Sequence, residues 1–513
     1  MANQLAIAPS QLPGFPGDDP TMTFPLRLSP FEKFVLWDER PSQPMTSFIE
    51  LHFASPLDSR RLQAALTVAV HRNPLLACRV VERDGDWWWD YDPLYQAELL
   101  VASTNPPLRQ GWPIPIDLRR ECGGRYWYGA CSDQSQGEAG WRLMIQLHHA
   151  CCDGVGMRRV LIDALSGYAQ PLQSLLALDP SNQPELEQEL EESAGEAFEE
   201  ELDDAPSGIA DAKQLRWEAL SVEALRERFD FSGLTSTPPK RTLTTWQRIK
   251  NASYFHFRLP TALRGTATEE SGLLAVDDSE PLRHASLSRQ HSQQILERAR
   301  QSQISINDLA LTLLFQTCAR WNRQLGDRNN KSHIRLLMPY DLRSRVDLRM
   351  PAANRLSFSF LGRNADQCQD FDMLLASVQA EVLAIKESRL PLDFLDALKS
   401  AARRPRAMKW VINRSRRMAT VVLTYTGDIS RGMQRYFPEQ DGMRVVGDTH
   451  VTNIYAAPPI REHTNISLGL CVNWGQLCFS AAWNRAAMTP DQCEEFLAFY
   501  LTAWHDWLQS PEA

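Results

Sequence analysis

Strand-like and helix-like hydrophobic patterns alternate in both halves of the chain, and this alternation is what most constrains the fold. In Trp141–Leu147 apolar side chains occupy every second position, the periodicity of a β-strand with one buried face. Apolar residues then recur at helical spacing from Met157 to Tyr168. In the second half, helical patterns at Ser286–Ser302 and Ile306–Trp321 precede strand-like segments. The sequence therefore predicts an α/β protein with sheets and helices in both halves.

Turn and capping signals place several further elements. Asp58 or Ser59 can cap a helix that runs to residue 72. The dipeptide at 84–85, Asp-Gly, suits a tight turn between two strands. Near the end of the chain two strands form a hairpin that turns at 474–476, and a capping box at Thr489 predicts the start of the last helix. No short repeat occurs, but the two halves are compatible with two copies of one α/β layer arrangement.

The length of 513 residues predicts at least two domains, and an acidic segment divides them. Residues 179–204 hold 12 Asp and Glu and no Lys or Arg. Removing these from the chain's 63 acidic residues leaves 51 against 54 basic ones, so the net charge of −9 belongs to this segment. We expect a disordered arm at 1–24, a first subdomain at 25–170, an acidic insertion or linker at 171–239, and a crossover and second subdomain at 240–513.

Composition disfavours several classes of protein. The near-balanced charge outside the acidic segment argues against nucleic-acid binding. No apolar run reaches the length of a transmembrane helix, and the N-terminal stretch lacks the basic and apolar regions of a signal peptide. The ten cysteines are scattered, so we expect reduced thiols that pack as small hydrophobic side chains. The expectation is a cytoplasmic protein, and a monomer because both halves lie in one chain.

The strand at 141–147 leads into LHHACCDGVG (Leu147–Gly156), in which two histidines, two cysteines and an aspartate fall within six residues. Structural zinc sites use spaced ligand pairs that turn inward together, whereas adjacent residues at a strand end point in different directions. The sequence holds no second Cys/His cluster, so no metal site is predicted. Adjacent cysteines form a strained ring, which disfavours a Cys151–Cys152 redox pair.

A catalytic base is the third role open to this stretch. Histidine titrates near neutrality and is the most common general base. At the end of a central strand it would face a cleft on a rigid backbone, and Asp153 could fold back to fix its geometry. Gly154 would let the chain turn sharply there. From these residues alone, a structural histidine pair and a catalytic base both stay open.

The stretch HHACCDG resembles the HHxxxDG signature of the chloramphenicol acetyltransferase-like superfamily, and its context, a strand before and a helix after, is similar too. That group includes condensation domains, polyketide-associated acyltransferases, wax ester synthases and alcohol acyltransferases. Four other segments resemble the family: LSPFEKFVLW, AALTVAVHRNPLLACRV, SQISINDLALTLLFQTCARW and MPYDLRSRVDLRMPAANRLSF. The resemblance covers most of 25–508 except the acidic insertion. It implies two chloramphenicol acetyltransferase-like mixed-sheet subdomains that form a V-shaped pseudo-dimer with a channel between them.

The resemblance also implies roles for single residues. His149, the second histidine of the motif, would be the general base that takes a proton from the acceptor. Asp153 would turn away from the substrate and pair with an arginine of the second half, for which Arg343 is the best match and Arg345 the weaker one. His148 would be structural, and Gly154 would keep the turn of the loop.

A donor for the oxyanion of the tetrahedral intermediate is expected from the second half of the chain. In LTYTGDIS, Thr424 and Gly427 stand at the places that match a Ser/Thr-Asn-x-Gly-like stretch of the family. Tyr425 replaces the more common asparagine, which is a departure from the family pattern. An ordinary strand-to-loop turn is the alternative interpretation of this segment.

A basic segment in the second half suggests a partner. Residues 399–417 hold eight Lys and Arg and no acidic residue. They could attract coenzyme A phosphates, an acidic carrier protein or an anionic membrane. A solvated basic face that balances the acidic insertion is the alternative.

Three functions follow from the resemblance and the residues. The first is an acyltransferase that moves an acyl group from a coenzyme A or carrier-protein thioester, as co-substrate, to a small-molecule alcohol or amine, with no bound cofactor. The second is a non-catalytic condensation-like protein that binds a carrier protein or another partner. The third, a thioester hydrolase with Cys151 or Cys152 as nucleophile, is the least favoured.

Overall fold

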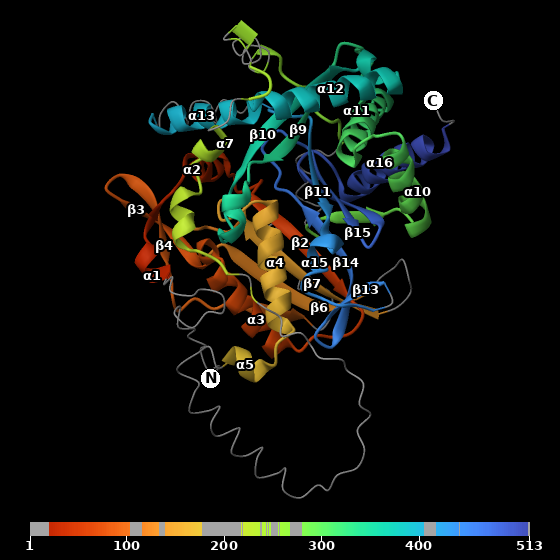
Figure 1. The fold of residues 1–513 in the computed structure, drawn as a ribbon. Helices are drawn as coiled ribbons and strands as arrows, with labels where there is room; N and C mark the ends of the chain where they lie inside the picture. Colours follow the sequence, from red (N-terminus) through yellow and green to blue (C-terminus); the bar gives the residue numbers. More distant parts are fainter. Residues whose placement is uncertain are drawn as a thin grey trace, which may run out of the picture.

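The computed structural model describes residues 20–102, 115–132, 139–176, 217, 219–235, 239–242, 244, 246–247, 255, 257–266, 280–404, 417–440 and 442–510. Among these residues two mixed sheets dominate, and each is packed with helices (Figure 1). A small antiparallel sheet, in the order β1-β4-β3, lies beside the first of them. No helix of the described residues is long and apolar enough to cross a membrane.

The first large sheet has the strand order β12-β13-β14-β2-β7-β6-β5. Its central strands pair antiparallel along the whole of β2, from Thr46 opposite His148 to Phe53 opposite Trp141. Helices α3 and α4 pack against one another, and the buried side chains of both belong to the same core as the apolar residues of β2 and β7. The elements of this subdomain and the small sheet beside it are β1 (Leu26–Arg27), α2 (Pro30–Asp38), β2 (Thr46–Phe53), α3 (Ser59–Arg72), β3 (Cys78–Arg83), β4 (Asp86–Tyr91), β5 (Leu99–Ala102), β6 (Gly124–Ser132), β7 (Ala139–His148), α4 (Gly154–Tyr168) and α5 (Leu172–Leu176).

The second large sheet has the order β10-β9-β11-β15-β16-β8, and α11 and α16 pack together in its core. Its elements are β8 (Arg283–Ser286), α10 (Arg289–Gln301), α11 (Ile306–Gln324), β9 (His333–Asp341), η6 (Arg345–Arg349), β10 (Leu356–Asn364), α12 (Phe371–Ser388), α13 (Leu390–Ala402), β11 (Val421–Asp428), α15 (Ile429–Met433), β15 (Ile466–Asn473), β16 (Gln476–Trp483) and α16 (Pro490–Gln509).

Local signals in the sequence coincide with the observed boundaries. Asp58 caps α3, and Thr489 forms a complete capping box at the start of α16. The β3–β4 hairpin turns through Asp84 and Gly85, both with positive φ, as a type I′-like turn requires. These elements match the expected positions because their signals act within a few residues.

A segment from the second half of the sequence completes the first sheet. Strands β12 (Glu439–Gln440), β13 (Met443–Val446) and β14 (Thr449–Ala457) form one edge of it, with β14 paired antiparallel to β2. The chain then returns to the second sheet through β15. The two subdomains are therefore joined by an exchanged strand as well as by the linker.

The expected arm and linker both extend into the folded body, which corrects the sequence interpretation. Pro20–Thr23 form the short helix α1, and the Thr23 hydroxyl lies 3.3 Å from a carboxylate oxygen of Glu223. Within the expected linker, Glu223–Glu227 form η4, Ser232–Thr235 form α7, and Val222 is buried in the first core. The sequence missed these contacts because each segment is too short to show a hydrophobic period. The rest of the arm (1–19) and the acidic residues 179–204 lie outside the described residues.

Candidate active site

The motif forms the loop between β7 and α4. His148 is the last residue of β7, and Gly154 is the first residue of α4. Asp153 is the N-cap of that helix, and its Oδ1 accepts a hydrogen bond from the Gly156 N–H at 2.9 Å. A carboxylate suits this place because the first amides of a helix have no partner within the helix. Since β7 pairs with β2 and β6 on its two sides, the loop starts from a rigid central strand.

Asp153 forms a two-pronged ion pair with Arg343 from the other half of the chain. Nη1 and Nη2 of Arg343 each lie 2.8 Å from a carboxylate oxygen of Asp153. The backbone N–H of Arg355 donates to the same carboxylate at 2.8 Å. Burial alone would raise the pKa of Asp153, but Arg343 and these hydrogen bonds hold the pKa below its usual value. Arg345, the weaker candidate from the sequence, lies exposed in η6.

His149 is buried, and one ring nitrogen is held by the loop itself. Its Nδ1 lies 3.0 Å from the carbonyl oxygen of Cys152, which can only accept, so Nδ1 carries the proton. Nε2 is then the unprotonated nitrogen of the neutral ring. Burial lowers the pKa of His149, against smaller opposing effects of the Cys152 carbonyl and the Asp153 charge. The neutral imidazole is therefore favoured near pH 7, as a general base requires.

Asn354 holds the backbone of the loop and was not singled out from the sequence. Its side-chain amide donates to the carbonyl oxygens of His149 (2.9 Å) and Ala150 (2.8 Å). The backbone N–H of His149 donates to the carbonyl of Met45 at 2.8 Å. The signal for Asn354 was present as the asparagine of the segment that resembles the family, but its partner could not be read from the sequence.

The His148 side chain contacts the loop and a neighbouring carboxylate. Its Nδ1 accepts a hydrogen bond from the Ala150 N–H at 3.0 Å, and its Nε2 lies 3.3 Å from a carboxylate oxygen of Glu39. The side chain is fully buried. These contacts agree with a structural role in shaping the loop.

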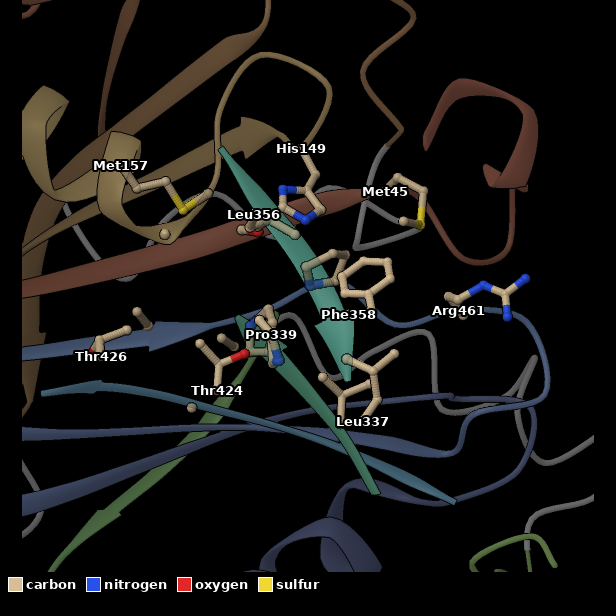
Figure 2. Close-up of a pocket in the computed structure, with 18 of the residues that line it drawn as sticks. Met45, His149, Met157, Leu337, Pro339, Leu356, Phe358, Thr424, Thr426 and Arg461 are labelled. Carbon is tan, nitrogen blue, oxygen red and sulfur yellow. The ribbon is translucent and has the colours of Figure 1, made fainter. Parts of the chain in front are cut away.

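The His149 ring projects into a mostly apolar cavity of about 90 Å³ between the two subdomains (Figure 2). The first half contributes Phe34, Met45 and Met157, and the second half contributes side chains from β9, β10 and β11. The apolar residues labelled on the second-half wall in Figure 2 are Leu337, Pro339, Leu356 and Phe358. A small apolar pocket with a few polar groups is typical of a binding site for a small molecule.

Of the two expected oxyanion residues, the structure brings Thr424 to this cavity and leaves Gly427 outside its lining. The Thr424 hydroxyl is buried and has no hydrogen-bond partner among the described residues. Gly427 has a φ of 75° and lies where the pairing of β11 with β15 is irregular, between Tyr425 and Asp428. Thr426, which the sequence analysis did not select, also lines the cavity.

Gly154 does not make the turn that the sequence analysis assigned to it. Its φ lies outside the left-handed region, because the residue already belongs to the regular helix α4. A Cβ at Gly154 would meet no atom within 4 Å, and the residue lines the cavity. The constrained glycine is Gly156, where a Cβ would lie 2.8 Å from the Cβ of Cys152.

The two cysteines of the motif are packed in the core and not presented to the cavity. Cys151 and Cys152 are completely buried, and burial raises the pKa of both thiols well above the usual value. A thiolate is the nucleophilic form of cysteine, so these environments disfavour nucleophilic catalysis. All ten cysteines are buried, and none of them forms a disulfide.

Comparison with known proteins agrees with this architecture. No protein-family model matches the chain. Over 133 residues, 26% of this chain, it is 31% identical to CymA, a probable non-canonical nonribosomal peptide synthetase of Salinispora arenicola, and it spans about 2% of that protein's length.

Solved structures match nearly the whole chain at low identity. Polyketide synthase associated protein 5 from Mycobacterium tuberculosis has a TM-score of 0.52 at 14% identity, covering 98% of this chain and 100% of its own. The EpoB cyclization-docking bidomain of a nonribosomal peptide synthetase from Sorangium cellulosum has a TM-score of 0.56 at 13% identity, covering 100% and 88%. The starter condensation domain of rhizomide synthetase, in complex with C8-CoA and Leu-SNAC, has a TM-score of 0.51 at 12% identity, covering 95% and 96%.

These likenesses establish the class of the fold. The chain has the fold of condensation domains, with two α/β subdomains arranged as a V-shaped pseudo-dimer. The fold expected from the motif and its matching segments is thereby confirmed.

Proposed function

We propose that this chain is an acyltransferase that moves an acyl group from a coenzyme A or carrier-protein thioester to a hydroxyl or amine acceptor, with His149 as general base. The observation that carries the proposal is the hydrogen bond of His149 Nδ1 to the Cys152 carbonyl. It fixes the neutral tautomer with an unprotonated Nε2, on a ring that lines a cavity between the two subdomains. The fold supports the class of reaction, since its structural relatives include condensation domains.

The proposed reaction has two proton transfers. Nε2 of His149 accepts the proton of the acceptor hydroxyl or amine as that atom attacks the thioester carbonyl. The tetrahedral intermediate carries its negative charge on the former carbonyl oxygen, and the Thr424 hydroxyl supplies a hydrogen bond to it. The intermediate then collapses, the C–S bond breaks, and the leaving thiolate takes the proton back from His149.

The polarity of the cavity favours an apolar substrate group next to the reacting carbonyl. Leu337, Leu356 and Phe358 carry no polar group that could bind a polar substrate chain. Burying each CH₂ of an alkyl chain against them contributes about 0.8 kcal/mol to the free energy of binding. The structural relative that was solved with C8-CoA is an example of this fold holding an acyl thioester. A thioester donor with a short apolar acyl chain is thus the first substrate to test.

Arg343 and Asn354 act through the loop in this proposal. Arg343 ties Asp153 to the second half, and Asn354 holds the carbonyl of His149. Both residues fix where the His149 ring stands, and neither reaches the reacting atoms. We regard them as positioning residues.

The basic segment 399–417 remains a candidate surface for the donor's phosphates or for an acidic carrier protein. Most of it, residues 405–416, lies outside the described residues. Within the described part, the Arg417 guanidinium donates to the carbonyl oxygens of His463 (2.8 Å) and Pro260 (3.3 Å).

The test is acyl transfer by purified protein with His149→Ala as the variant. The matched control is His505→Ala, which changes a half-buried histidine of α16 outside the cavity lining. Octanoyl-CoA and an octanoyl N-acetylcysteamine thioester are incubated with mixed alcohols and amines, and products are identified by mass spectrometry. A general base contributes about 10²–10⁴-fold, so turnover by His149→Ala should fall by that factor while its circular dichroism stays native. Equal turnover by this variant and the wild type contradicts the mechanism. Absence of transfer in every mixture favours the second candidate, a binding protein without catalysis.

A further inference from the structure

A second group of reactive side chains lies at the contact between the subdomains, away from the candidate active site. Glu50 and His52 stand two residues apart on β2 and so share one face of the first sheet. His284 comes from β8, the edge strand of the second sheet. One ligand atom of each residue lies within 4.8 Å of the other two.

The two imidazoles converge on the carboxylate of Glu50. Nε2 of His52 lies 2.6 Å and Nε2 of His284 lies 3.5 Å from the same oxygen, Oε1 of Glu50. The second oxygen, Oε2, is buried and accepts no hydrogen bond from any described residue. Leaving a buried carboxylate oxygen unpaired is costly, so a further positive partner at Oε2 would be favourable.

We propose that Glu50, His52 and His284 bind a zinc ion that links the two subdomains. Two imidazoles and one carboxylate are an established zinc ligand set, with Zn–N and Zn–O distances of about 2.0–2.2 Å. Tetrahedral bonds of that length set ligand atoms about 3.4 Å apart, close to the separation of Glu50 and His284. The short contact between His52 and Glu50 would open by roughly 0.8 Å as the metal replaces the shared proton.

Neighbouring rings already orient the two imidazoles. The His284 ring stacks on Tyr455 with a centroid distance of 4.1 Å, and the His52 ring meets both His284 and Tyr455 edge-on at 5.6 Å. Such supporting contacts fix the rings of metal-binding histidines. The His284 side chain is 33% exposed, which leaves a route for the ion and a place for water as the fourth ligand.

Arg142 also contacts this carboxylate, and its charge is shared with another acid. Its guanidinium lies 3.5 Å from Glu50 Oε1, but its two shorter hydrogen bonds, 2.9 and 3.0 Å, go to Glu280. Arg142 can therefore keep its charge paired with Glu280 while a zinc ion binds Glu50.

The proposed site is separate from the chemistry at His149. Glu50 lies four residues along β2 from Thr46, the residue that pairs with His148. At ~3.3 Å per residue this is a separation of roughly 13 Å. Zinc at this position would stabilise the contact between the sheets and take no part in acyl transfer.

The experiment is zinc binding by the untagged full-length chain after removal of metal with a chelator. Zn²⁺ is titrated in competition with a chromogenic chelator, and bound metal is counted by elemental analysis. The variants are His284→Gln and His52→Gln. The control is His291→Gln, because His291 is half-buried beside His505, with ring centroids 4.8 Å apart, and does not belong to the group of Glu50, His52 and His284.

We expect one zinc ion per chain in the wild type and in His291→Gln. Loss of one ligand should weaken binding by at least ~100-fold, and zinc should raise the melting temperature of the wild type and of His291→Gln but not of the two ligand variants. A wild-type chain that binds no stoichiometric zinc, or a His284→Gln variant that binds it as well as the wild type, overturns the proposal.

A measurement on the wild type alone guards against variants that fail to fold. Co²⁺ replaces Zn²⁺ in such sites and gives visible absorption bands when it has four ligands. Four-coordinate Co²⁺ bands that disappear when Zn²⁺ is added support the proposed site. If only the weak spectrum of hydrated Co²⁺ is seen, the chain does not bind the metal through these residues.

Discussion

A single hydrogen bond, from His149 Nδ1 to the Cys152 carbonyl, sets which nitrogen of the imidazole is left for chemistry. The contact is made within the loop, so it depends on the loop's shape and not on a distant carboxylate. The loop's shape in turn depends on Asp153, which caps α4 and pairs with Arg343 at the same time. At the scale of the residue, the motif thus combines the proposed base, His149, with Asp153, which supports the loop that holds it.

The low pKa of His149 predicts an unusual acid limb in the pH profile of acyl transfer. Burial favours the neutral imidazole, so the pKa lies below the ordinary value of 6.5. Activity needs this neutral form, and it should therefore be retained at pH 6.5 and be lost only at lower pH. The measurement is kcat/KM from pH 4.5 to 8 with a non-ionising alcohol, which reports the free enzyme. A half-maximal point above pH 6.5 would contradict the burial argument.

At the scale of the element, the start of α4 holds two glycines with different constraints. A Cβ at Gly156 would lie 2.8 Å from Cys152 Cβ and 3.3 Å from Ala352 Cβ, whereas a Cβ at Gly154 would meet nothing within 4 Å. Gly156 lets the helix approach the loop and the residues from the second half of the chain. Gly154 leaves room in the cavity.

These constraints predict opposite results for two alanine variants. Gly156→Ala should lower the free energy of unfolding by about 1–3 kcal/mol, because the added methyl overpacks the junction. Gly154→Ala should keep it within about 0.5 kcal/mol of the wild type and raise KM, because its methyl enters the cavity. Urea unfolding and steady-state kinetics measure the two effects. Equal stability of both variants would show that the junction can relax.

At the scale of the whole molecule, the two sheets touch where β14 passes β15. A Cβ at Gly469 would lie 1.8 Å from the carbonyl oxygen of Ala456, so only glycine fits this crossing. Close by, the Asn473 side chain donates to the Ile454 carbonyl at 2.6 Å. The cavity at His149 includes both Gly469 and Ala456, so the same crossing shapes one of its walls.

Substituting Gly469 should therefore damage stability and activity together. Gly469→Ala is expected to lose about 1–3 kcal/mol of the free energy of unfolding and to reduce turnover, since the exchanged strand must shift. Gly233→Ala, at a position where a Cβ meets nothing within 4 Å, is the control. Chemical denaturation with a parallel activity assay checks this, and an unchanged unfolding midpoint for Gly469→Ala would argue against a rigid crossing.

The sequence by itself determined the elements whose signals are local. Caps at Asp58 and Thr489, the turn at Asp84-Gly85 and the strand–loop–helix frame of the motif all rest on interactions within about four residues. Resemblance in separate segments then indicated the fold and pointed to Arg343 as the partner of Asp153. Short segments such as α1 and η4 were missed because they carry no period of their own.

Only the tertiary structure decided what depends on residues far apart in the chain. It added β14 to the first sheet, placed Asn354 on the loop, put Thr424 at the cavity without Gly427, and brought His284 to Glu50 and His52. None of these contacts leaves a mark in its neighbours along the sequence, because long-range pairing is set by how whole sheets pack. The motif is visible in the sequence, whereas the pocket beside it is formed by side chains from both halves of the chain, which only the folded structure brings together.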